Sequence, residues 1–358
     1  MKGQTTSRPA KTPRERFFEA LRREKPDRVP MFELTISPKV IDGIHPGMDY
    51  YDFIDTIDHE AVGPNTTWDP LGFVAWVDEE KGVFRDRWGV IRRYAGEVIP
   101  VPIEGPIKSR EDLKRYRPPD PAEEPLLKVL PELIERFRDR RATFILGRDA
   151  WTGSYMIRGM ENLLMDLAID PDMVREIVRI NVDYYKEVHR RAIEMGVDFI
   201  ALVDDYAFKS GPLMSPRQFE QLIYPGLKET VSAIKAQGVM CTKHTDGNIW
   251  PIIEMIVDAG VDALGPLEPG AGMDLAKVQE RFGDRIAVIG NVDCDLLGRG
   301  QPEDIRREVK LLLKRVSRDG GHILSSGNSI PSSTRPENFM AMVNACRELG
   351  RYPIEVPD

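Results

Sequence analysis

The segment with the clearest capacity for chemistry is 244–248, His-Thr-Asp-Gly-Asn, which follows the apolar run at residues 238–241. If that run is a β-strand, the alternation of side chains places His244 and Asp246 on the same face of the sheet. Asn248 can then cap a following helix. An imidazole and a carboxylate at the end of a strand can bind a divalent metal or transfer protons. The alternative is that His244 only packs and Asp246 only caps a helix.

Length and composition limit the class of protein. The chain has 358 residues, of which 41% are hydrophobic and 30% charged, and this is enough to bury a sizeable core. The net charge of -8 argues against a nucleic-acid-binding surface. No apolar run approaches the roughly 20 residues that span a bilayer, and the amino terminus lacks the apolar segment of a secretory signal. Three widely spaced cysteines favour free thiols. We therefore expect a cytoplasmic protein without nucleic-acid or membrane partners.

Short apolar runs alternate with helical patterns along most of the chain. Strands are predicted at residues 28–34, 143–146, 198–203, 239–241, 263–267, 286–289 and 322–324. Helices are predicted at residues 14–21, 171–195, 215–237, 249–259, 274–282, 302–318 and 336–349. This alternation predicts parallel strands with helices outside them. Seven parallel strands are visible, and we expect an eighth in the irregular region described next. The predicted fold is therefore an α/β protein, a distorted (β/α)8 TIM-type barrel.

Two regions depart from this alternation. Residues 1–13 are polar, basic and proline-containing, which indicates a flexible N-terminal arm. Residues 14–358 are then predicted to form a single domain. Within it, residues 40–140 lack clean periodicity, and we interpret them as an irregular excursion that shapes or covers a pocket. One part of this excursion, residues 82–94, alternates like a β-hairpin that turns near Gly89.

Polar side chains follow nearly every predicted strand. They are Glu33, Arg148-Asp149, Asp204-Asp205-Tyr206, His244 with Asp246, Glu268, Asn291 with Asp293, and the segment Ser325-Ser326-Gly327-Asn328. In a barrel these groups would converge on one mouth, where such folds keep their active sites. A single acidic residue after a strand usually caps a helix, but the repetition favours a functional mouth. Asp204 and Asp205 cannot both face that mouth on a regular strand.

Several motifs resemble those of the uroporphyrinogen decarboxylase superfamily. They are Asp27-Arg28-Val29-Pro30, Gly211-Pro212-Leu213-Met214-Ser215-Pro216, His244-Thr245-Asp246-Gly247-Asn248, Gly265-Pro266-Leu267-Glu268-Pro269, Gly290-Asn291-Val292-Asp293 and Gly320-Gly321-His322-Ile323-Leu324. The resemblance covers residues 14–350 in order. It implies a distorted α/β barrel. It also implies one of two activities, the decarboxylation of the haem pathway or cobamide-dependent methyl transfer.

The residues after the Asp-Arg-x-Pro motif differ from those of the decarboxylase branch. That branch is expected to carry an arginine-rich R-Q-A-G-R segment there, which grips the carboxylates of the substrate. Residues 31–38 of this chain contain no arginine, and Glu33 stands among them. A carboxylate at this place would repel an acidic substrate. The resemblance is therefore closer to the methyltransferase branch.

In the methyltransferase branch, zinc is bound through an H-x-C motif and a distant cysteine after the last strand. This chain keeps His244 but has Asp246 in place of the first cysteine and Asn328 near the place of the second. Zinc also accepts histidine and carboxylate ligands, so a zinc site at His244 and Asp246 remains a prediction. The chain has no D-x-H-x-x-G cobalamin signature, so cobalamin (a corrinoid) would be carried by a partner protein.

The leading hypothesis is a corrinoid-linked methyltransferase or demethylase that acts on a small methylated substrate. The residues predicted to be catalytic are Asp205, His244, Asp246 and Glu268. The residues predicted to bind substrate are Glu33, Asp149, Tyr206, Asn291, Asp293, Ser326 and Asn328. Glu268 or Asp293 would join His244 and Asp246 around a metal or in proton transfer, and Asp205 would orient the substrate. Two alternatives stay open, a decarboxylase and a non-catalytic ligand-binding barrel. An oligomer is possible, and the sequence does not determine the oligomeric state.

Overall fold

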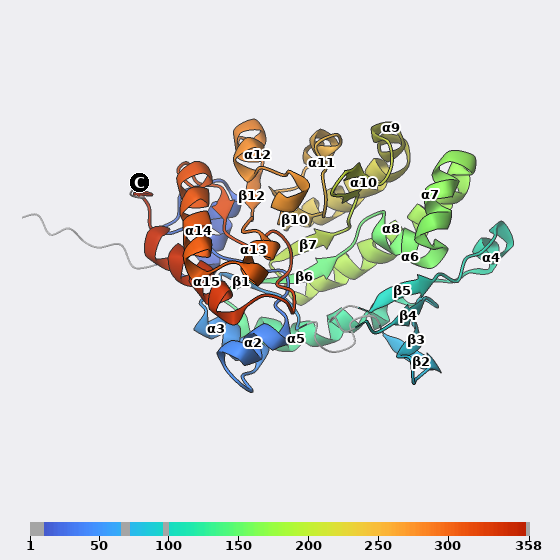
Figure 1. Ribbon diagram of the computed structural model, residues 1–358. Coiled ribbons are helices and arrows are strands. Elements are labelled where there is room, and N and C mark those ends of the chain that lie inside the picture. The colour runs from blue at the N-terminus through green and yellow to red at the C-terminus, as the bar shows by residue number, and fades with distance from the viewer. Residues whose placement is uncertain (1–10, 66–71, 96–99, 356–358) are drawn as a thin grey trace, which may run out of the picture.

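The computed structural model of the protein describes residues 11–65, 72–95 and 100–355. In this part of the chain, seven strands form one curled parallel sheet with helices on its outer side (Figure 1). The order of the strands across the sheet is β1-β6-β7-β10-β11-β12-β13. Their bounds are β1 Ala61–Val62, β6 Ala142–Gly147, β7 Phe199–Val203, β10 Met240–His244, β11 Ala263–Leu264, β12 Ala287–Ile289 and β13 His322–Ile323. The predicted α/β barrel is confirmed.

The predicted first strand is not a regular strand, but its backbone connects the two edges of the sheet. Phe32 N donates to Leu324 O at 3.1 Å, directly after β13, and Glu60 N donates to Met31 O at 3.0 Å, directly before β1. Pro30 helps to explain the interruption, because proline has no N–H group to offer a neighbouring strand. The eighth strand expected in the irregular region is β1.

Helices follow most of the strands and cover the sheet. The bounds of the described helices are α1 Pro13–Leu21, α2 Pro38–Ile44, α3 Tyr50–Thr56, α4 Arg110–Arg115, α5 Pro125–Phe137, α6 Thr152–Arg158, α7 Met160–Ile169, α8 Pro171–Met195, α9 Pro216–Gln218, α10 Tyr224–Lys235, α11 Ile253–Asp258, α12 Leu275–Phe282, α13 Cys294–Arg299, α14 Pro302–Val316 and α15 Pro336–Leu349. The predicted helix at residues 215–237 consists of α9, a π-helical stretch at Phe219–Ile223, and α10. Every described helix is too short or too polar to serve as a membrane span.

Aromatic side chains fill the amino-terminal end of the barrel. The rings of Phe32 and Phe144 have centroids 5.1 Å apart, and the ring of Phe17 from α1 lies 4.9 Å from that of Phe199. All four side chains are fully buried. The other strands contribute small side chains to the same cluster, such as Ala263, because these rings already fill much of the interior. A ligand pocket therefore has to lie at the opposite, carboxyl end of the strands.

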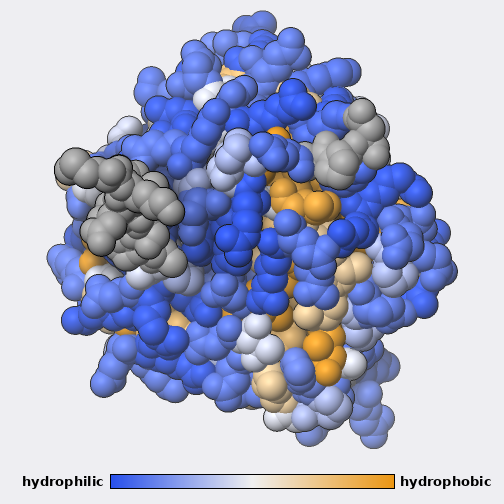
Figure 2. Space-filling model, turned by 90° about the vertical axis from the view of Figure 1, so that its left-hand side faces the viewer, coloured by the Kyte–Doolittle hydropathy of each residue, from blue (hydrophilic) through white to orange (hydrophobic). Residues whose placement is uncertain are grey.

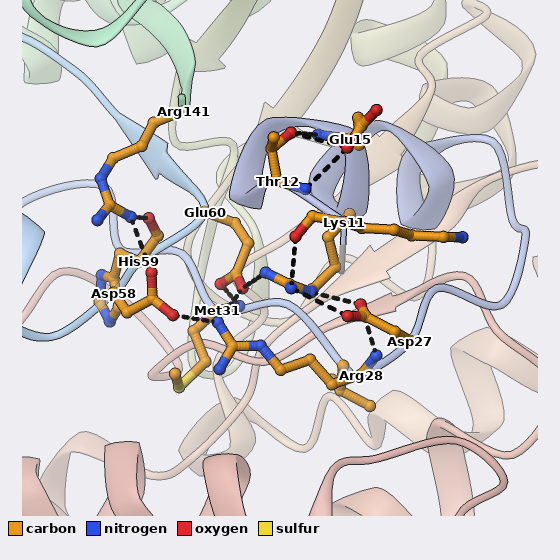
Figure 3. A network of polar contacts seen from close by, with 12 residues as sticks. Lys11, Thr12, Glu15, Asp27, Arg28, Met31, Asp58, His59, Glu60 and Arg141 are labelled. Carbon is orange, nitrogen blue, oxygen red and sulfur yellow. Dashed lines mark hydrogen bonds and ion pairs between the residues drawn. The ribbon is translucent and has the colours of Figure 1, made fainter. Parts of the chain in front are cut away.

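A network of ion pairs holds the segment 27–30 to the start of β1 (Figure 3). Arg28 Nη2 lies 2.5 Å from Asp58 Oδ2 and 2.9 Å from Glu60 Oε1. Arg16 Nη1 lies 2.9 Å from the same oxygen of Glu60. Glu60 is fully buried, so loss of either arginine would leave its charge poorly compensated. The Asp-Arg-x-Pro motif thus has a structural role, at the end of the barrel away from the predicted chemistry.

Part of the irregular excursion forms a small antiparallel sheet that projects from the barrel (Figure 1). Its strands are β2 Phe73–Asp78, β3 Val83–Asp86, β4 Ile91–Arg93 and β5 Val101–Glu104. The hairpin predicted at residues 82–94 is the pair β3–β4. A further short hairpin after β7 consists of β8 Ala207–Phe208 and β9 Gly211–Pro212. Several apolar residues of β2 are exposed, among them Val74 at 58% and Trp76 at 44%.

The surface elsewhere is more polar. The face shown in Figure 2 is largely hydrophilic, with a narrow band of hydrophobic residues across it. Residues 1–10 of the predicted N-terminal arm lie outside the described residues. Pro13 already belongs to α1, because Thr12 caps the helix: its Oγ1 accepts from Glu15 N at 3.1 Å.

Candidate active site

A pocket of about 350 Å³ opens at the carboxyl ends of β6, β7 and β10, and we call it the central pocket. Its apolar walls include residues of β5, β6 and β7. The polar side chains that line it are those of Thr35, Arg148, Thr152, Tyr155, Asp205, His244, Asp246, Asn328 and Ser329. Four of the residues predicted for the site therefore share one pocket: Asp205, His244, Asp246 and Asn328.

Strand alternation explains which side chains enter the central pocket. Leu146 lies inside the barrel near the end of β6, and Arg148 follows it by two residues into the pocket. Val203 and Asp205 stand in the same relation at the end of β7. Alternate residues of a strand face the same side, so the apolar series inside the barrel continues into polar groups at its mouth. The same rule turns Asp204 away from the pocket, where it is fully buried.

His244 lies between two carboxylates. Its Nε2 atom is 3.2 Å from Asp246 Oδ1 and 3.7 Å from Asp205 Oδ1. Its Nδ1 atom is 2.9 Å from the carbonyl oxygen of Pro266. A carbonyl can only accept a hydrogen bond, so Nδ1 carries a hydrogen and Nε2 is the atom that faces the carboxylates. Backbone hydrogen bonding adds to the cluster, because Asp246 N donates to Asp205 Oδ1 at 3.1 Å.

The close contacts shift the pKa values of all three groups. Burial lowers the pKa of His244, but the hydrogen bond and charge of Asp246 and the charge of Asp205 outweigh burial and raise it. Burial likewise opposes ionisation of Asp246, yet His244 and Asn328 hold the pKa of that carboxyl below its usual value. Burial raises the pKa of Asp205, against the opposing charge of His244. His244, with its raised pKa, is therefore a strong proton acceptor. Asp205, whose pKa is also raised, can carry a proton beside it.

The same cluster fits a divalent cation. One ligand atom from each of Asp205, His244 and Asp246 lies within 4.8 Å of the other two. Ligands at about 2.1 Å from a tetrahedral zinc ion are roughly 3.4 Å apart, so small side-chain rotations would suffice. The hydrogen bond from His244 Nδ1 to a backbone carbonyl is the support that metal-bound histidines usually have. One nitrogen and two carboxylates make a hard set of ligands. Such a set suits zinc, manganese or iron(II) and does not select for metals that prefer thiolates.

Asn328 approaches this cluster from the far end of the chain. Its Nδ2 atom donates to Asp246 Oδ1 at 2.7 Å, across 82 residues of sequence. Ser329 N donates to Asn328 Oδ1, which holds the side chain in place. Asn328 therefore orients Asp246 toward His244.

Three further residues line the central pocket: Arg148, which the sequence placed at the mouth without a role, and Thr152 and Tyr155, which it did not single out. Arg148 has a side chain that is 21% exposed, and its Nη1 lies 3.7 Å from Asp204 Oδ1. Thr152, at the start of α6, accepts a hydrogen bond from Asp205 N at 3.3 Å. Tyr155 follows on the same helix and also lines the pocket. For Arg148, strand alternation from Leu146 was the signal that could have found it; the two helix residues carry no such signal.

Asp149 and Tyr206 do not line the central pocket, which corrects their prediction as substrate-binding residues. Both are fully buried beneath it. Lys243 Nζ lies 3.0 Å from Asp149 Oδ2, and the hydroxyl of Tyr206 donates to Asp149 Oδ1. Lys243 Nζ also lies 4.2 Å from the centroid of the Tyr206 ring and donates to Asp204 O at 2.8 Å. These residues form a buried polar layer that supports the pocket from below.

Glu33 and Ser326 are also buried and bind each other instead of a ligand. Ser326 N and Oγ donate to the carboxyl group of Glu33 at 2.8 and 2.6 Å, and Ser325 Oγ donates at 3.2 Å. Burial raises the pKa of Glu33 to about 8, against these hydrogen bonds. The carboxyl group does not line the central pocket. Glu33 was predicted to repel an acidic substrate; its carboxyl group is instead buried against Ser325 and Ser326.

The remaining predicted residues lie outside the central pocket. Glu268 and Asp293 line a neighbouring pocket of about 110 Å³, which shares Asn328 with the central one. Asp293 also caps α13. Asn291 lines a separate cavity between α12 and α14. The place beside His244 that was predicted for Glu268 or Asp293 is taken by Asp205.

The family model for uroporphyrinogen decarboxylase (URO-D) matches residues 88–349. The chain belongs to the uroporphyrinogen decarboxylase family. It is 27% identical over 259 residues to the uroporphyrinogen decarboxylase of Methylococcus capsulatus, covering 69% of this chain and 71% of the relative. It is 26% identical over 356 residues to the uroporphyrinogen decarboxylase of Chlorobium chlorochromatii, covering 93% and 97%.

A solved structure with the same fold is a methyltransferase from Methanosarcina mazei. The similarity covers 94% of this chain and 99% of that chain, with a TM-score of 0.72 and 21% sequence identity. The family of this chain thus includes relatives named for decarboxylation, and its fold also occurs in a methyltransferase. Members of the family are enzymes, and the central pocket is where we look for the activity of this one.

Proposed function

We propose that this protein is a corrinoid-linked methyltransferase, which moves a methyl group between a small methylated substrate and the cobalamin of a separate protein. The observation that carries the proposal is the meeting of His244, Asp246 and Asn328 at one side of the central pocket. These are the positions at which the resemblance places the zinc ligands of the methyltransferase branch. Asp246 and Asn328 are far apart in sequence, yet their side chains are 2.7 Å apart.

The lining of the central pocket favours a small substrate over a porphyrinogen. A substrate with many carboxylates needs several cationic groups to bind it. Among the described residues that line the pocket, Arg148 is the one arginine or lysine. Asp205 and Asp246 add negative charge to the same wall. A volume of about 350 Å³ lies at the small end of the range for ligand pockets.

Demethylation of an oxygen atom suits this site better than methylation of a thiol. When a methyl carbon leaves an ether oxygen, the electron pair of the broken bond stays on the oxygen, which must be stabilised or protonated. A divalent cation bound by Asp205, His244 and Asp246 would polarise that oxygen as a Lewis acid. The side chains themselves offer a proton-carrying imidazole beside two carboxylates. The site has no thiolate among its described residues, so it lacks the ligands that tune zinc for thiol activation.

The corrinoid of the partner has to reach the central pocket from outside. Strand β5 contributes Val101 to the wall of the pocket, and Val101 is also 46% exposed. Ile103, two residues further along the same strand, is 53% exposed. An apolar surface of this kind next to a site is typical of a docking face. We expect the corrinoid protein to contact the exposed side of β5.

The direct test is methyl transfer to cobalamin. The purified protein is mixed with cob(I)alamin and a panel of methoxylated and methylated compounds, and formation of methylcob(III)alamin is followed by absorbance. His244→Ala is the matched inactive variant, and Lys209→Gln, on the surface outside the central pocket, is the matched active one. We expect transfer from at least one compound, with a loss of about 100-fold or more in the His244 variant.

Two results would overturn the proposal. One is the absence of methylated cobalamin across the panel with protein that is folded and loaded with divalent metal. The other is turnover of uroporphyrinogen to coproporphyrinogen at a useful rate, which would assign the chain to the activity for which its curated relatives are named. The two assays use the same preparation, so a failed preparation is distinguishable from a wrong proposal.

A further inference from the structure

Arg148 is a cation in the central pocket that makes no hydrogen-bonded ion pair with a described carboxylate. Its Nη1 atom is 3.7 Å from Asp204 Oδ1, which is longer than a hydrogen bond. Asp204 Oδ1 is buried and accepts no hydrogen bond from any described residue. The other carboxylate oxygen of Asp204 accepts from Asp149 N and Trp151 N at 3.2 and 2.8 Å. Asp204 therefore serves mainly to fix the backbone after β6 and leaves the guanidinium group of Arg148 available.

The guanidinium group has more donors than its protein contacts use. It carries five N–H groups in a planar fork that matches a carboxylate. The hydroxyl of Tyr185 lies beside it and accepts one hydrogen bond at most. Tyr155 lies near the guanidinium group, and Tyr155 and Thr152 both line the pocket with hydroxyl groups. A planar cation flanked by hydroxyls on an otherwise apolar wall is an arrangement that binds an organic anion.

We propose that Arg148 binds the carboxylate of the substrate, so that the enzyme acts on a small carboxylic acid that carries a methyl ether at its opposite end. This inference rests on the proposed function, because the methyl ether is the reacting group. It adds the class of substrate and names Arg148 as the residue that selects it.

The order of the strands sets the length of that substrate. Arg148 follows β6, and His244 ends β10, with β7 and Asp205 between them. Two strand spacings separate the backbones at these positions by roughly 10 Å. This separation is on the scale of a benzene ring or a short chain with a carboxylate at one end and a methoxy group at the other. The apolar walls, such as Leu146 and Val203, would contact its middle part.

The charges of the side chains in the pocket favour one orientation for such an anion. Asp205 and Asp246 repel a carboxylate at the His244 side of the pocket. At the other side, the negative charge of Asp204 is offset by Lys243 as well as by Arg148. The carboxylate is therefore drawn to Arg148, and the neutral methoxy group is left to face His244.

Binding of two probe molecules tests this inference without any corrinoid. Affinities for 4-methoxybenzoate and for its neutral analogue 4-methoxybenzyl alcohol are measured by calorimetry at pH 7.5. We expect the wild type to bind the acid about 10- to 100-fold more tightly, as a charge-assisted bidentate contact allows. Arg148→Gln is expected to lose this preference while its affinity for the alcohol stays within about twofold. Arg148→Lys, which keeps the charge but not the fork, is expected to lie between the two.

Lys209→Gln is the matched control, because it removes a positive charge from the same end of the barrel outside the central pocket. It is expected to keep the preference for the acid. Thermal unfolding of each variant shows whether it is folded. Equal affinity of the wild type for acid and alcohol, or a preference that survives Arg148→Gln in folded protein, would overturn the inference. Methyl transfer from neutral ethers alone would overturn the inference about Arg148 but support the proposed function. Selective binding of the acid without any methyl transfer would support the inference but overturn the proposed function.

Discussion

Lys243 Nζ lies 3.0 Å from Asp149 Oδ2, and neither side chain is exposed to solvent. A buried ion pair is costly to break from one side, because the remaining charge is left without a partner. We predict that Lys243→Met destabilises the protein by about 3–5 kcal/mol, measured by urea unfolding. Adding Asp149→Asn to the same chain is expected to restore more than half of the loss.

Lys209→Met is the comparison for this measurement. Lys209 lies on the surface, with a side chain that is 65% exposed, and its contact with Glu268 is 3.5 Å long. Its loss is expected to change the stability by less than about 1 kcal/mol. Equal effects at Lys243 and Lys209 would contradict the prediction, and so would a double variant no more stable than Lys243→Met alone.

Glu33 makes the stability of the protein depend on pH. Its pKa is raised from 4.5 to about 8, so the folded protein keeps a proton that the unfolded chain releases between these values. Stability is therefore expected to fall as the pH rises from about 4.5 to about 8, by up to roughly 5 kcal/mol, and to level off above that. Glu33→Gln removes this contribution, because an amide can accept from Ser326 N and has no proton to lose.

Urea unfolding of the wild type and Glu33→Gln at pH 5.5 and pH 8.5 checks this expectation. At the higher pH, the free energy of unfolding of the wild type should be lower relative to that of Glu33→Gln than at the lower pH. Comparing the change between the two pH values removes the contribution of every other titrating group that both proteins share. A difference that is the same at both pH values would show that Glu33 is ionised in the folded protein.

The order of the elements and one half of the site were predictable from the sequence. Apolar runs and their helices located β6, β7, β10 and α8, because short parallel strands and long amphipathic helices leave strong patterns. His244 and Asp246 were placed together by strand alternation alone. The same rule, continued from Leu146, also separates Arg148 from Asp149, since one faces the pocket and the other does not.

The rest depended on long-range packing. Nothing in the sequence near Glu33 shows that Ser325 and Ser326 bury it, since they lie almost 300 residues away. Lys243 reads as a polar residue in an apolar strand, and its partner Asp149 belongs to another strand end. Asp293 stood at a strand end like the residues of the central pocket, but the capping of α13 accounts for it. Polar residues at strand ends thus served three purposes, and only the tertiary contacts separate them.

Metal content distinguishes the two uses of the cluster around His244. We predict about one divalent ion per chain in protein purified without chelators, and its loss in His244→Ala, Asp246→Ala and Asp205→Ala. Elemental analysis of the purified variants measures this. Glu268→Ala is the control. Glu268 lies in the neighbouring pocket, so this variant should keep the ion. Loss of the ion in Glu268→Ala but not in Asp205→Ala would contradict the assignment of ligands. Protein free of metal would leave proton transfer as the role of the cluster.

Restoring cysteines at two positions gives a sharper test of the site. The resemblance places one zinc-binding cysteine where this chain has Asp246 and a second near Asn328, and the side chains of Asp246 and Asn328 are in contact. We predict that the double variant Asp246→Cys with Asn328→Cys binds zinc at least about tenfold more tightly than the wild type, because thiolates are strong zinc ligands. Competition with a coloured zinc chelator measures the affinity.

The matched control for the double variant pairs Asp246→Cys with Asp293→Cys. Asp293 also follows a strand but lies in the neighbouring pocket, so its thiol should not reach an ion held by His244. We expect this control to bind zinc no more tightly than Asp246→Cys alone. If both double variants gain equally, the gain reflects an added thiol anywhere near the barrel mouth. If the double variant with Asn328→Cys binds zinc more tightly and the control does not, the side chains at positions 244, 246 and 328 converge on one ion. This chain then has a harder set of ligands at the place in the fold where its relatives with cysteines have a thiolate site.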